Sequence, residues 1–230
     1  MRAALVFAMS LFLARINAQD SARILVPAGK SFSDVAGLGK AFRFPNFTNG
    51  HVYFRDGTQS TAKLNYNFFY KDLEYISPSG DTLALVKDQA VEIKNILIDS
   101  FTFYYYDGYL EEIAHSENGK LLKRQFYGII KGSEKIGAYG QPSATSAIDA
   151  YTGLTYRGIR FENLVVSENM VLVLKTEYFI GDNYNTVLRA NKKNLLELYP
   201  KKRAQIESYL SNNHVNFSNG ADLEKLFSSF

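Results

Sequence analysis

Short strand-forming segments separated by turn signals are the feature that most constrains this fold. Asp56-Gly57, Asp107-Gly108 and Asn118-Gly119 supply residues that tolerate positive φ, which two-residue hairpin turns require. Aromatic and β-branched residues, which favour strands, fill the segments around these turns. Because each turn joins neighbours in the chain, the pattern predicts an antiparallel meander. The expected strands are 51–56, 61–67, 71–77, 81–86, 91–98, 101–106, 109–114, 120–130, 159–166 and 171–180.

The apolar pattern within these segments indicates how the sheet is covered. Alternation in the LNYN motif predicts a buried face with Leu64 and Tyr66 and a solvent-exposed face with Asn65 and Asn67. Residues 91–98 are instead apolar on both faces, as in strands that are covered on both sides. We therefore expect a mainly β fold of about ten strands, an antiparallel meander sheet that is curved or sandwich-like.

The pattern becomes helical near the end of the chain. Pro200 suits the start of a helix, and Ser218 or Asn219 can cap another. Helices this short are not stable alone in water, so we expect residues 183–230 to be a helical segment packed on the β domain. The expected helices cover 191–199, a segment that begins at Pro200, and 221–227.

The N-terminal part of the chain divides into two segments. Residues 1–18 combine a charged start, an apolar run and a small-residue cleavage site, which predicts a signal peptide; a buried helix is the alternative. The apolar run is shorter than the roughly 20 residues of a transmembrane helix, so no membrane span is expected. Residues 19–45 are weakly patterned and are expected to form an extended segment before an antiparallel β domain at 46–182.

Composition narrows the compartment and the chemistry. The chain has no cysteine, which excludes disulfides, cysteine-ligated metals and thiol catalysis and suits a bacterial periplasm or surface. The formal net charge is +3, but Arg2 and Arg15 lie in the expected signal peptide and would leave with it. The remainder is close to neutral, so nucleic acid is not an expected partner.

Tyrosines mark the candidate binding residues. Residues 137–158 form a long, hydroxyl-rich loop, and loops of this length in compact domains are usually functional or disordered. Strand alternation places Phe101, Phe103 and Tyr105 in the core and the intervening tyrosines on the opposite face. There they could stack on sugars or contact a peptide, although core packing or strand propensity also explains them. The candidate binding residues are Tyr104, Tyr106, Tyr139, Tyr151 and Tyr156.

Other motifs give weaker indications of chemistry. The sequence AGKS at 28–31 lacks the upstream glycine of a phosphate-binding loop, and the three histidines are far apart. Two carboxylate pairs, Asp72 with Glu74 and Glu111 with Glu112, leave acid/base catalysis open. We nevertheless expect no catalytic residue, no metal site and no cofactor, and the sequence favours a protein that is not an enzyme.

Two stretches carry a resemblance. They are PNFTNGHVYFRDGTQSTAKLNYNFFYKDLEYISPSGDTLAL at 45–85 and LYPKKRAQIESYL at 198–210. In these stretches the chain resembles an uncharacterised family of exported, β-rich proteins of Gram-negative bacteria. The resemblance implies export to the periplasm, the cell surface or the extracellular space, and it implies no catalytic residue because the family has no assigned activity.

Three functional hypotheses follow. The first is a non-enzymatic envelope or secreted protein that binds a glycan, lipid or protein component through the sheet face and the loop at 137–158. The second is a lipid or lipoprotein carrier with a cavity enclosed by a curved sheet and the C-terminal helices. The third is a carbohydrate-active enzyme that uses paired carboxylates.

Overall fold

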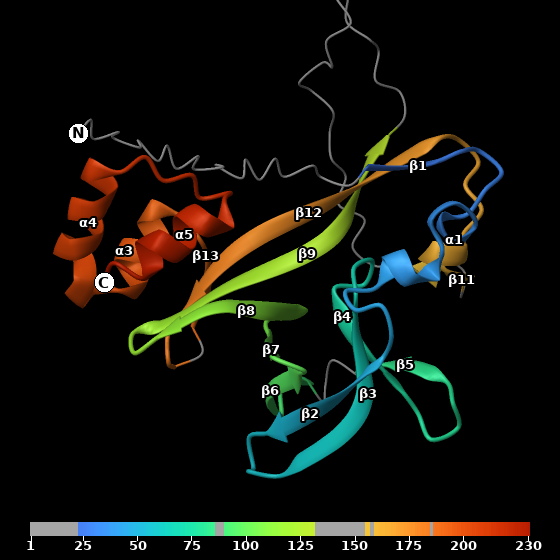
Figure 1. Ribbon diagram of the computed structural model, residues 1–230, viewed down its shortest axis with the longest axis horizontal. Coiled ribbons are helices and arrows are strands. Elements are labelled where there is room, and N and C mark those ends of the chain that lie inside the picture. The colour runs from blue at the N-terminus through green and yellow to red at the C-terminus, as the bar shows by residue number, and fades with distance from the viewer. Residues whose placement is uncertain (1–22, 86–89, 132–154, 157–158, 185) are drawn as a thin grey trace, which may run out of the picture.

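The computed structural model describes residues 23–85, 90–131, 155–156, 159–184 and 186–230 (Figure 1). Most of the strands belong to one 11-stranded antiparallel sheet with the order β1-β12-β9-β8-β7-β6-β2-β3-β4-β5, in which β13 also pairs with β12. The strands are β1 (Arg23–Val26), β2 (Thr48–Phe54), β3 (Gln59–Asn67), β4 (Asp72–Ile76), β5 (Thr82–Ala84), β6 (Ile93–Ile98), β7 (Phe101–Tyr105), β8 (Tyr109–Ser116), β9 (Gly119–Lys131), β10 (Thr155–Tyr156), β11 (Ile159–Arg160), β12 (Met170–Gly181) and β13 (Val187–Arg189).

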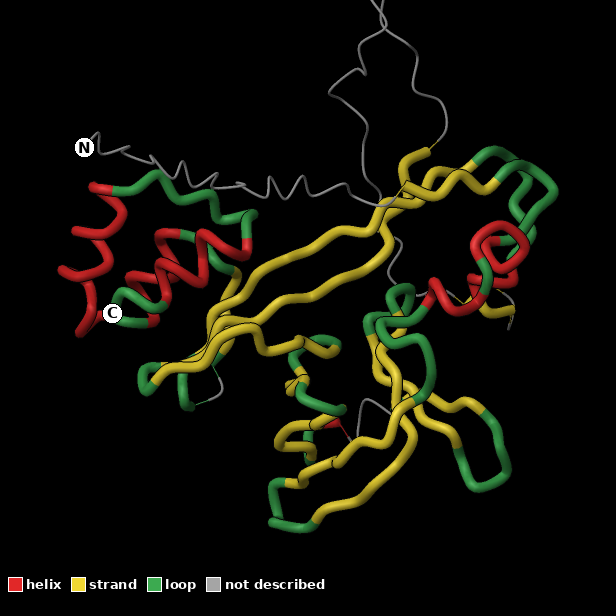
Figure 2. The backbone as a smooth tube through the Cα atoms, viewed as in Figure 1, coloured by secondary structure: helices red, strands yellow, loops and turns green. Residues whose placement is uncertain are grey.

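Helices lie at both ends of the chain and cluster after the last strand (Figure 2). They are α1 (Phe32–Ala36), α3 (Lys192–Leu198), α4 (Arg203–Asn212) and α5 (Gly220–Phe227), with 3₁₀ turns η1 (Leu38–Ala41), η2 (Phe161–Asn163) and η3 (Pro200–Lys202). The mainly antiparallel β fold with a short C-terminal helical appendage is therefore confirmed.

Two meanders make up the sheet. Strands β2 to β5 form one, strands β6 to β9 followed by β12 form the other, and pairing of β2 with β6 joins them. The predicted turn residues have the required backbone, since Gly57, Asp107 and Gly108 all have positive φ. The sheet is open, and among the described residues β5 forms one edge while β1 and β13, which both pair with β12, form the other.

The sheet curls until the β3–β4 turn reaches β8 and β9. The amide of Tyr127 donates to the carbonyl of Phe68 at 3.1 Å, and the amide of Tyr109 donates to the carbonyl of Lys71 at 3.0 Å. Lys71 has a φ of 58°, which lets the turn close tightly at this point. The curl therefore creates an inner face, which carries Tyr127, and an outer face on the opposite side of β8, β9 and β12.

The N-terminal segment packs along β3 instead of running free. A capping box between Ser31 and Asp34 starts α1, and the chain then pairs with the end of β3 through a bond from the Arg43 amide to the Tyr66 carbonyl at 2.9 Å. The prediction that Asn65 and Asn67 lie on a solvent-exposed face is wrong. The N-terminal segment and the β3–β4 turn cover that face, and the two residues are 1% and 0% exposed.

Most of the strand predicted at 159–166 is also wrong. β11 ends at Arg160, and η2 follows. Glu162 in η2 is buried and accepts a hydrogen bond from the Tyr70 hydroxyl at 2.9 Å. Val166 then exchanges backbone hydrogen bonds with the Gly29–Lys30 loop, so Leu164 and Val166 pack against the core from a loop and not from a strand.

Two apolar clusters cover the inner face. The main core lies inside the curl of the sheet, between its two meanders. There the Phe32 and Phe69 rings meet edge to face with their centroids 4.8 Å apart, and the Phe69 and Tyr127 ring centroids are 4.9 Å apart. The second cluster packs α3, α4 and α5 onto Leu121, Tyr178 and Ile180 of β9 and β12. Both clusters leave the outer face of these strands for other contacts.

Candidate functional site

The outer face of β7, β8, β9 and β12 gathers cations and aromatic rings. Strand register places Arg124 opposite Glu177, Phe126 opposite Lys175 and Leu122 opposite Phe179, so these side chains share one face. A small apolar cluster of Leu110, Leu122 and Phe179, with Tyr104 and Val187 packed against it, forms the base of this face. We call the set Lys71, Tyr104, Tyr106, Lys120, Arg124, Phe126, Lys175 and Phe179 the outer-face site.

Each of three cations lies over an aromatic ring in this site. The Lys120 ammonium is 4.4 Å from the Tyr104 ring centroid, and the Arg124 guanidinium is 5.0 Å from that of Phe179. The Lys71 ammonium, which comes from the β3–β4 turn, is 4.4 Å from the ring centroid of Phe126. Such contacts cover the rings with side chains that keep their charge, and they contribute roughly 0.5–2 kcal/mol each.

Burial and neighbouring charge shift the pKa of several groups here. Burial lowers the pKa of Lys71 and Arg124 lowers it further, while Glu177 and Asp107 oppose the shift. Burial also lowers the pKa of Lys175. The pKa of Tyr104 is raised by burial and by Glu112 beside it.

The structure brings two of the five predicted binding tyrosines to the outer-face site. Tyr104 is half-buried against the small apolar cluster, and Tyr106 is 41% exposed. Tyr156 pairs with Ile159 in a separate two-stranded sheet, β10–β11. Tyr139 and Tyr151 lie outside the described residues, as does most of the loop expected at 137–158.

Sequence reasoning missed the cations of the site. Lys71 and Arg124 are far apart in the chain, and only the curl of the sheet brings them together. One signal was present, since strand alternation places the charged Arg124 between Leu122 and Phe126 on one face of β9. A buried charge in a strand of this kind requires a partner, a role or both.

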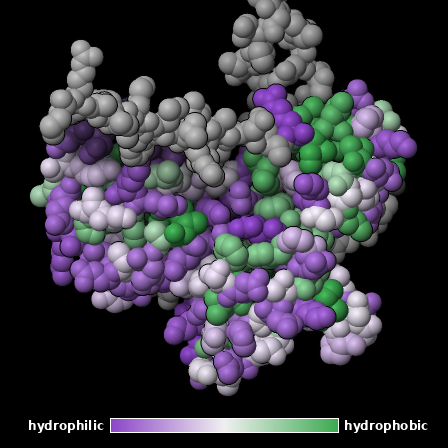
Figure 3. Space-filling model, in the orientation of Figure 1, coloured by the Kyte–Doolittle hydropathy of each residue, from purple (hydrophilic) through white to green (hydrophobic). Residues whose placement is uncertain are grey.

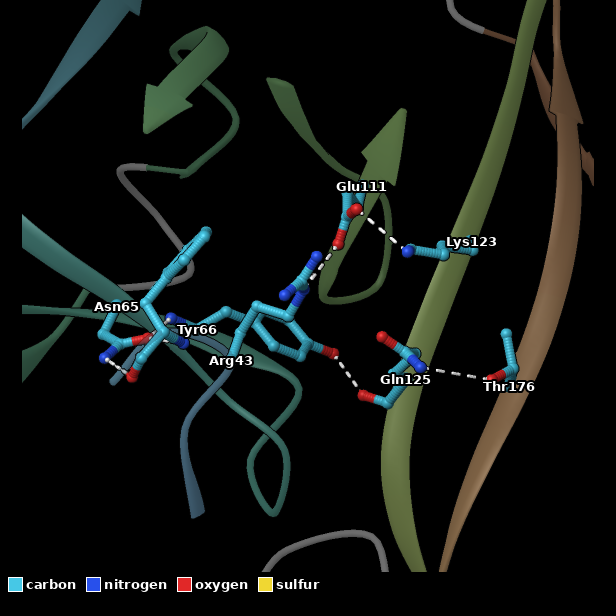
Figure 4. Close-up of polar contacts among 8 residues, drawn as sticks. Arg43, Asn65, Tyr66, Glu111, Lys123, Gln125 and Thr176 are labelled. Atoms are coloured by element: carbon cyan, nitrogen blue, oxygen red, sulfur yellow. Dashed lines mark hydrogen bonds and ion pairs between the residues drawn. The ribbon is translucent and has the colours of Figure 1, made fainter. Parts of the chain in front are cut away.

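A second polar cluster lies on the inner face (Figure 4). Glu111 is 6% exposed and joins two cations, with Lys123 Nζ at 2.9 Å and Arg43 Nε at 3.2 Å. The Tyr66 hydroxyl donates to the Gln125 carbonyl at 2.8 Å, and burial raises the pKa of this tyrosine. These residues line a pocket of about 10 Å³, roughly the space that one water molecule needs.

The two adjacent carboxylates considered for catalysis do not face each other. Glu111 lies opposite Lys123 on the inner face, whereas Glu112 lies opposite Leu122 on the outer face with its Oε2 3.5 Å from His115 Nδ1. In the other pair, Glu74 is buried and accepts a hydrogen bond from Asn67 at 3.2 Å. Across the described ranges, no group of three or more His, Cys, Asp or Glu side chains could hold a metal ion.

Apolar side chains are exposed at the end of the molecule that holds β1 and the start of β12 (Figure 3). They are Leu25 at 53%, Val35 at 43%, Leu38 at 52% and Val165 at 60% exposure. In the part of the chain that the structure describes, none of the helices has both the length and the apolar character needed to span a bilayer.

Comparison of the chain with protein-family models, with curated proteins and with solved structures gives no match.

Proposed function

We propose that the chain is an exported, non-enzymatic protein of the Gram-negative envelope or its surroundings that binds a ligand or partner through the outer-face site. One observation carries the proposal: charged and aromatic side chains converge on one sheet face while the described helices pack on the other. Rigid strands hold these groups in place, and aromatic and cationic side chains are the types enriched where proteins bind partners.

Two observations favour this function over its alternatives. The inner face between the meanders is filled by aromatic rings, and its polar pocket of about 10 Å³ is far too small for a lipid chain. Glu111 and Glu112 point to opposite faces, so this pair does not suit the acid/base chemistry of a carbohydrate-active enzyme. A binding surface requires neither an enclosed cavity nor a carboxylate pair.

Native mass spectrometry tests the proposal on the chain purified from a Gram-negative host. We expect the exported form to retain a lipid, glycan or protein partner, and we expect Tyr106→Ala to reduce that retained mass. Tyr184→Ala is the matched control, because Tyr184 is 88% exposed and lies in the β12–β13 connection, outside the outer-face site. Retention that is equal in both variants, or an exported form that binds no envelope fraction, would contradict the proposal.

A further inference from the structure

Arg124 is a buried charge without an acidic partner in the described structure. The residue is 8% exposed, and its Nη2 donates to the Tyr106 carbonyl at 2.8 Å. Its Nε is buried and has no acceptor. No carboxylate among the described residues lies within 4.0 Å of the guanidinium, and the facing Glu177 is paired with Arg189. Buried guanidinium groups are normally compensated by acids, so this arrangement needs a reason.

Lys71 is a second cation held beside the first. Its carbonyl accepts from the Tyr109 amide, while Arg124 donates to Tyr106 at the other end of the same β7–β8 turn. The Lys71 ammonium lies over the Phe126 ring, and Phe126 and Arg124 are two residues apart on the same face of β9, so the two cations occupy neighbouring positions on the outer face. Lys71 has no ion pair within the described ranges, although Asp107 and Glu177 lie close enough to favour its charged form. Two neighbouring cations repel each other, and this repulsion is relieved when an anion binds between them.

The surroundings provide access for such an anion. Lys71 is half-buried, and its ammonium lies over the Phe126 ring. Tyr106, at the rim, is 41% exposed. A guanidinium and an ammonium together can bind two oxygens of one anionic group, and a guanidinium is suited to bidentate contacts with carboxylates and phosphates.

We propose that Lys71 and Arg124 form an anchor for a two-oxygen anionic group, a carboxylate or a phosphate, carried by the ligand of the outer-face site. This inference rests on the proposed function and adds the chemical class of the ligand. Lys175, opposite Phe126 on β12, extends the cationic surface along the ligand. Asp107 opposes binding, because its carboxylate lies in the turn that both anchor residues contact.

The anchor is tested by titrating the intact chain with anions at constant ionic strength, with chloride as the reference anion. The probes are inorganic phosphate and glucuronate, whose separate effects distinguish a phosphate from a carboxylate group. We expect one of them to raise the midpoint of thermal unfolding and to bind the wild-type chain measurably by calorimetry. Lys71→Gln and Arg124→Met should each weaken binding at least about tenfold, as the loss of a charge-assisted hydrogen bond implies.

Two further variants complete the design. Lys94→Gln is the matched control, since Lys94 is an exposed lysine on β6 and its loss should leave binding unchanged. Asp107→Asn keeps a residue type that tolerates the φ of 45° at this position and should tighten binding. Without ligand, Arg124→Met should be at least as stable as the wild type, because an uncompensated buried charge is removed.

The inference is overturned if neither probe stabilises the chain beyond chloride, or if both anchor variants respond like Lys94→Gln. Destabilisation by Arg124→Met, combined with an unchanged response of Lys71→Gln, would assign the guanidinium a structural role and also overturn it. If Tyr106→Ala still abolishes retention of a partner while phosphate and glucuronate have no effect, the anchor fails and the proposed function stands.

Discussion

The side chain of Asn65 makes hydrogen bonds to Phe44 of the kind that a neighbouring backbone strand would otherwise make. Its Oδ1 accepts from the Phe44 amide at 3.0 Å, and its Nδ2 donates to the Phe44 carbonyl at 2.9 Å, so one side chain satisfies both backbone groups of a neighbour. We predict that Asn65→Ala lowers the free energy of unfolding by about 2 kcal/mol, because these buried groups lose their partners. Urea unfolding measures the change. Lys63→Ala, an exposed change on the same strand, should have little effect, and an equal loss in both variants would contradict this account.

Glu111 has a different role, because it compensates two cations at once. Replacing it with Gln removes the negative charge and leaves Lys123 and Arg43, whose side chains are 20% and 27% exposed, without their counter-ion. We predict a loss of about 2 kcal/mol of unfolding free energy for Glu111→Gln, reduced from the value for a fully buried pair because water reaches both cations. A chemical unfolding curve indistinguishable from that of the wild type would rule out this role.

Among the elements, the β8–β9 hairpin depends on one close approach. A Cβ atom on Gly119 would lie 2.1 Å from the Gly181 carbonyl oxygen and 2.7 Å from the Tyr199 hydroxyl, which itself donates to that carbonyl at 2.9 Å. We predict that Gly119→Ala costs more than about 3 kcal/mol of stability, because backbone in β12 must shift. Thermal unfolding compares it with Gly39→Ala, where a Cβ would meet open space and stability should hold or rise slightly.

The success of sequence-based prediction differs between elements for physical reasons. Hairpins are local, so turn pairs such as Asp107-Gly108 predict both the turn and the pairing around it. Likewise, Asn219 caps α5 as predicted through its bond with the Asp222 amide at 3.1 Å. The pairing of β2 with β6 and the contact of the β3–β4 turn with β9 are non-local, and no short motif encodes them.

The same distinction explains what could be predicted of the candidate site. Alternation along one strand was enough to place Tyr104 and Tyr106 opposite the core residue Phe103. Recognising Lys71 and Arg124 as neighbours requires the three-dimensional curl, because each looks in sequence like an ordinary charged residue near a strand. Non-local geometry therefore limits prediction of the site more than residue chemistry does.

For the molecule as a whole, buried tyrosines limit stability at high pH. Burial raises the pKa of Tyr66, Tyr104, Tyr109 and Tyr199 above the ordinary value of 10.0. Below that pH these groups are neutral in both states, and above it only the unfolded chain ionises, so folding stability falls as the pH rises. We predict that the midpoint concentration of denaturant for unfolding stays constant from about pH 8 to about pH 10 and falls at higher pH. Tyrosinate absorbance should rise together with unfolding.

The lysines with lowered pKa values change the pH dependence of stability in the opposite direction to the tyrosines. Between its lowered folded pKa and the ordinary value of 10.5, Lys71 binds fewer protons folded than unfolded, so it adds stability as the pH rises. Lys71→Gln should therefore make the alkaline loss of stability steeper. A midpoint that stays constant to about pH 11 in the wild-type chain would contradict the tyrosine argument.

The pairing of β1 with β12 has a consequence for the order of folding. Arg23 pairs with Val173 and Val26 with Met170, so β1 cannot pair until β12, which is synthesised much later, has been made. The hairpins between them bring together only near neighbours and can form early, whereas closing so long a loop is slow. Strand β1 is thus among the last parts of the sheet to fold, and until β12 is made it remains unpaired and available to chaperones.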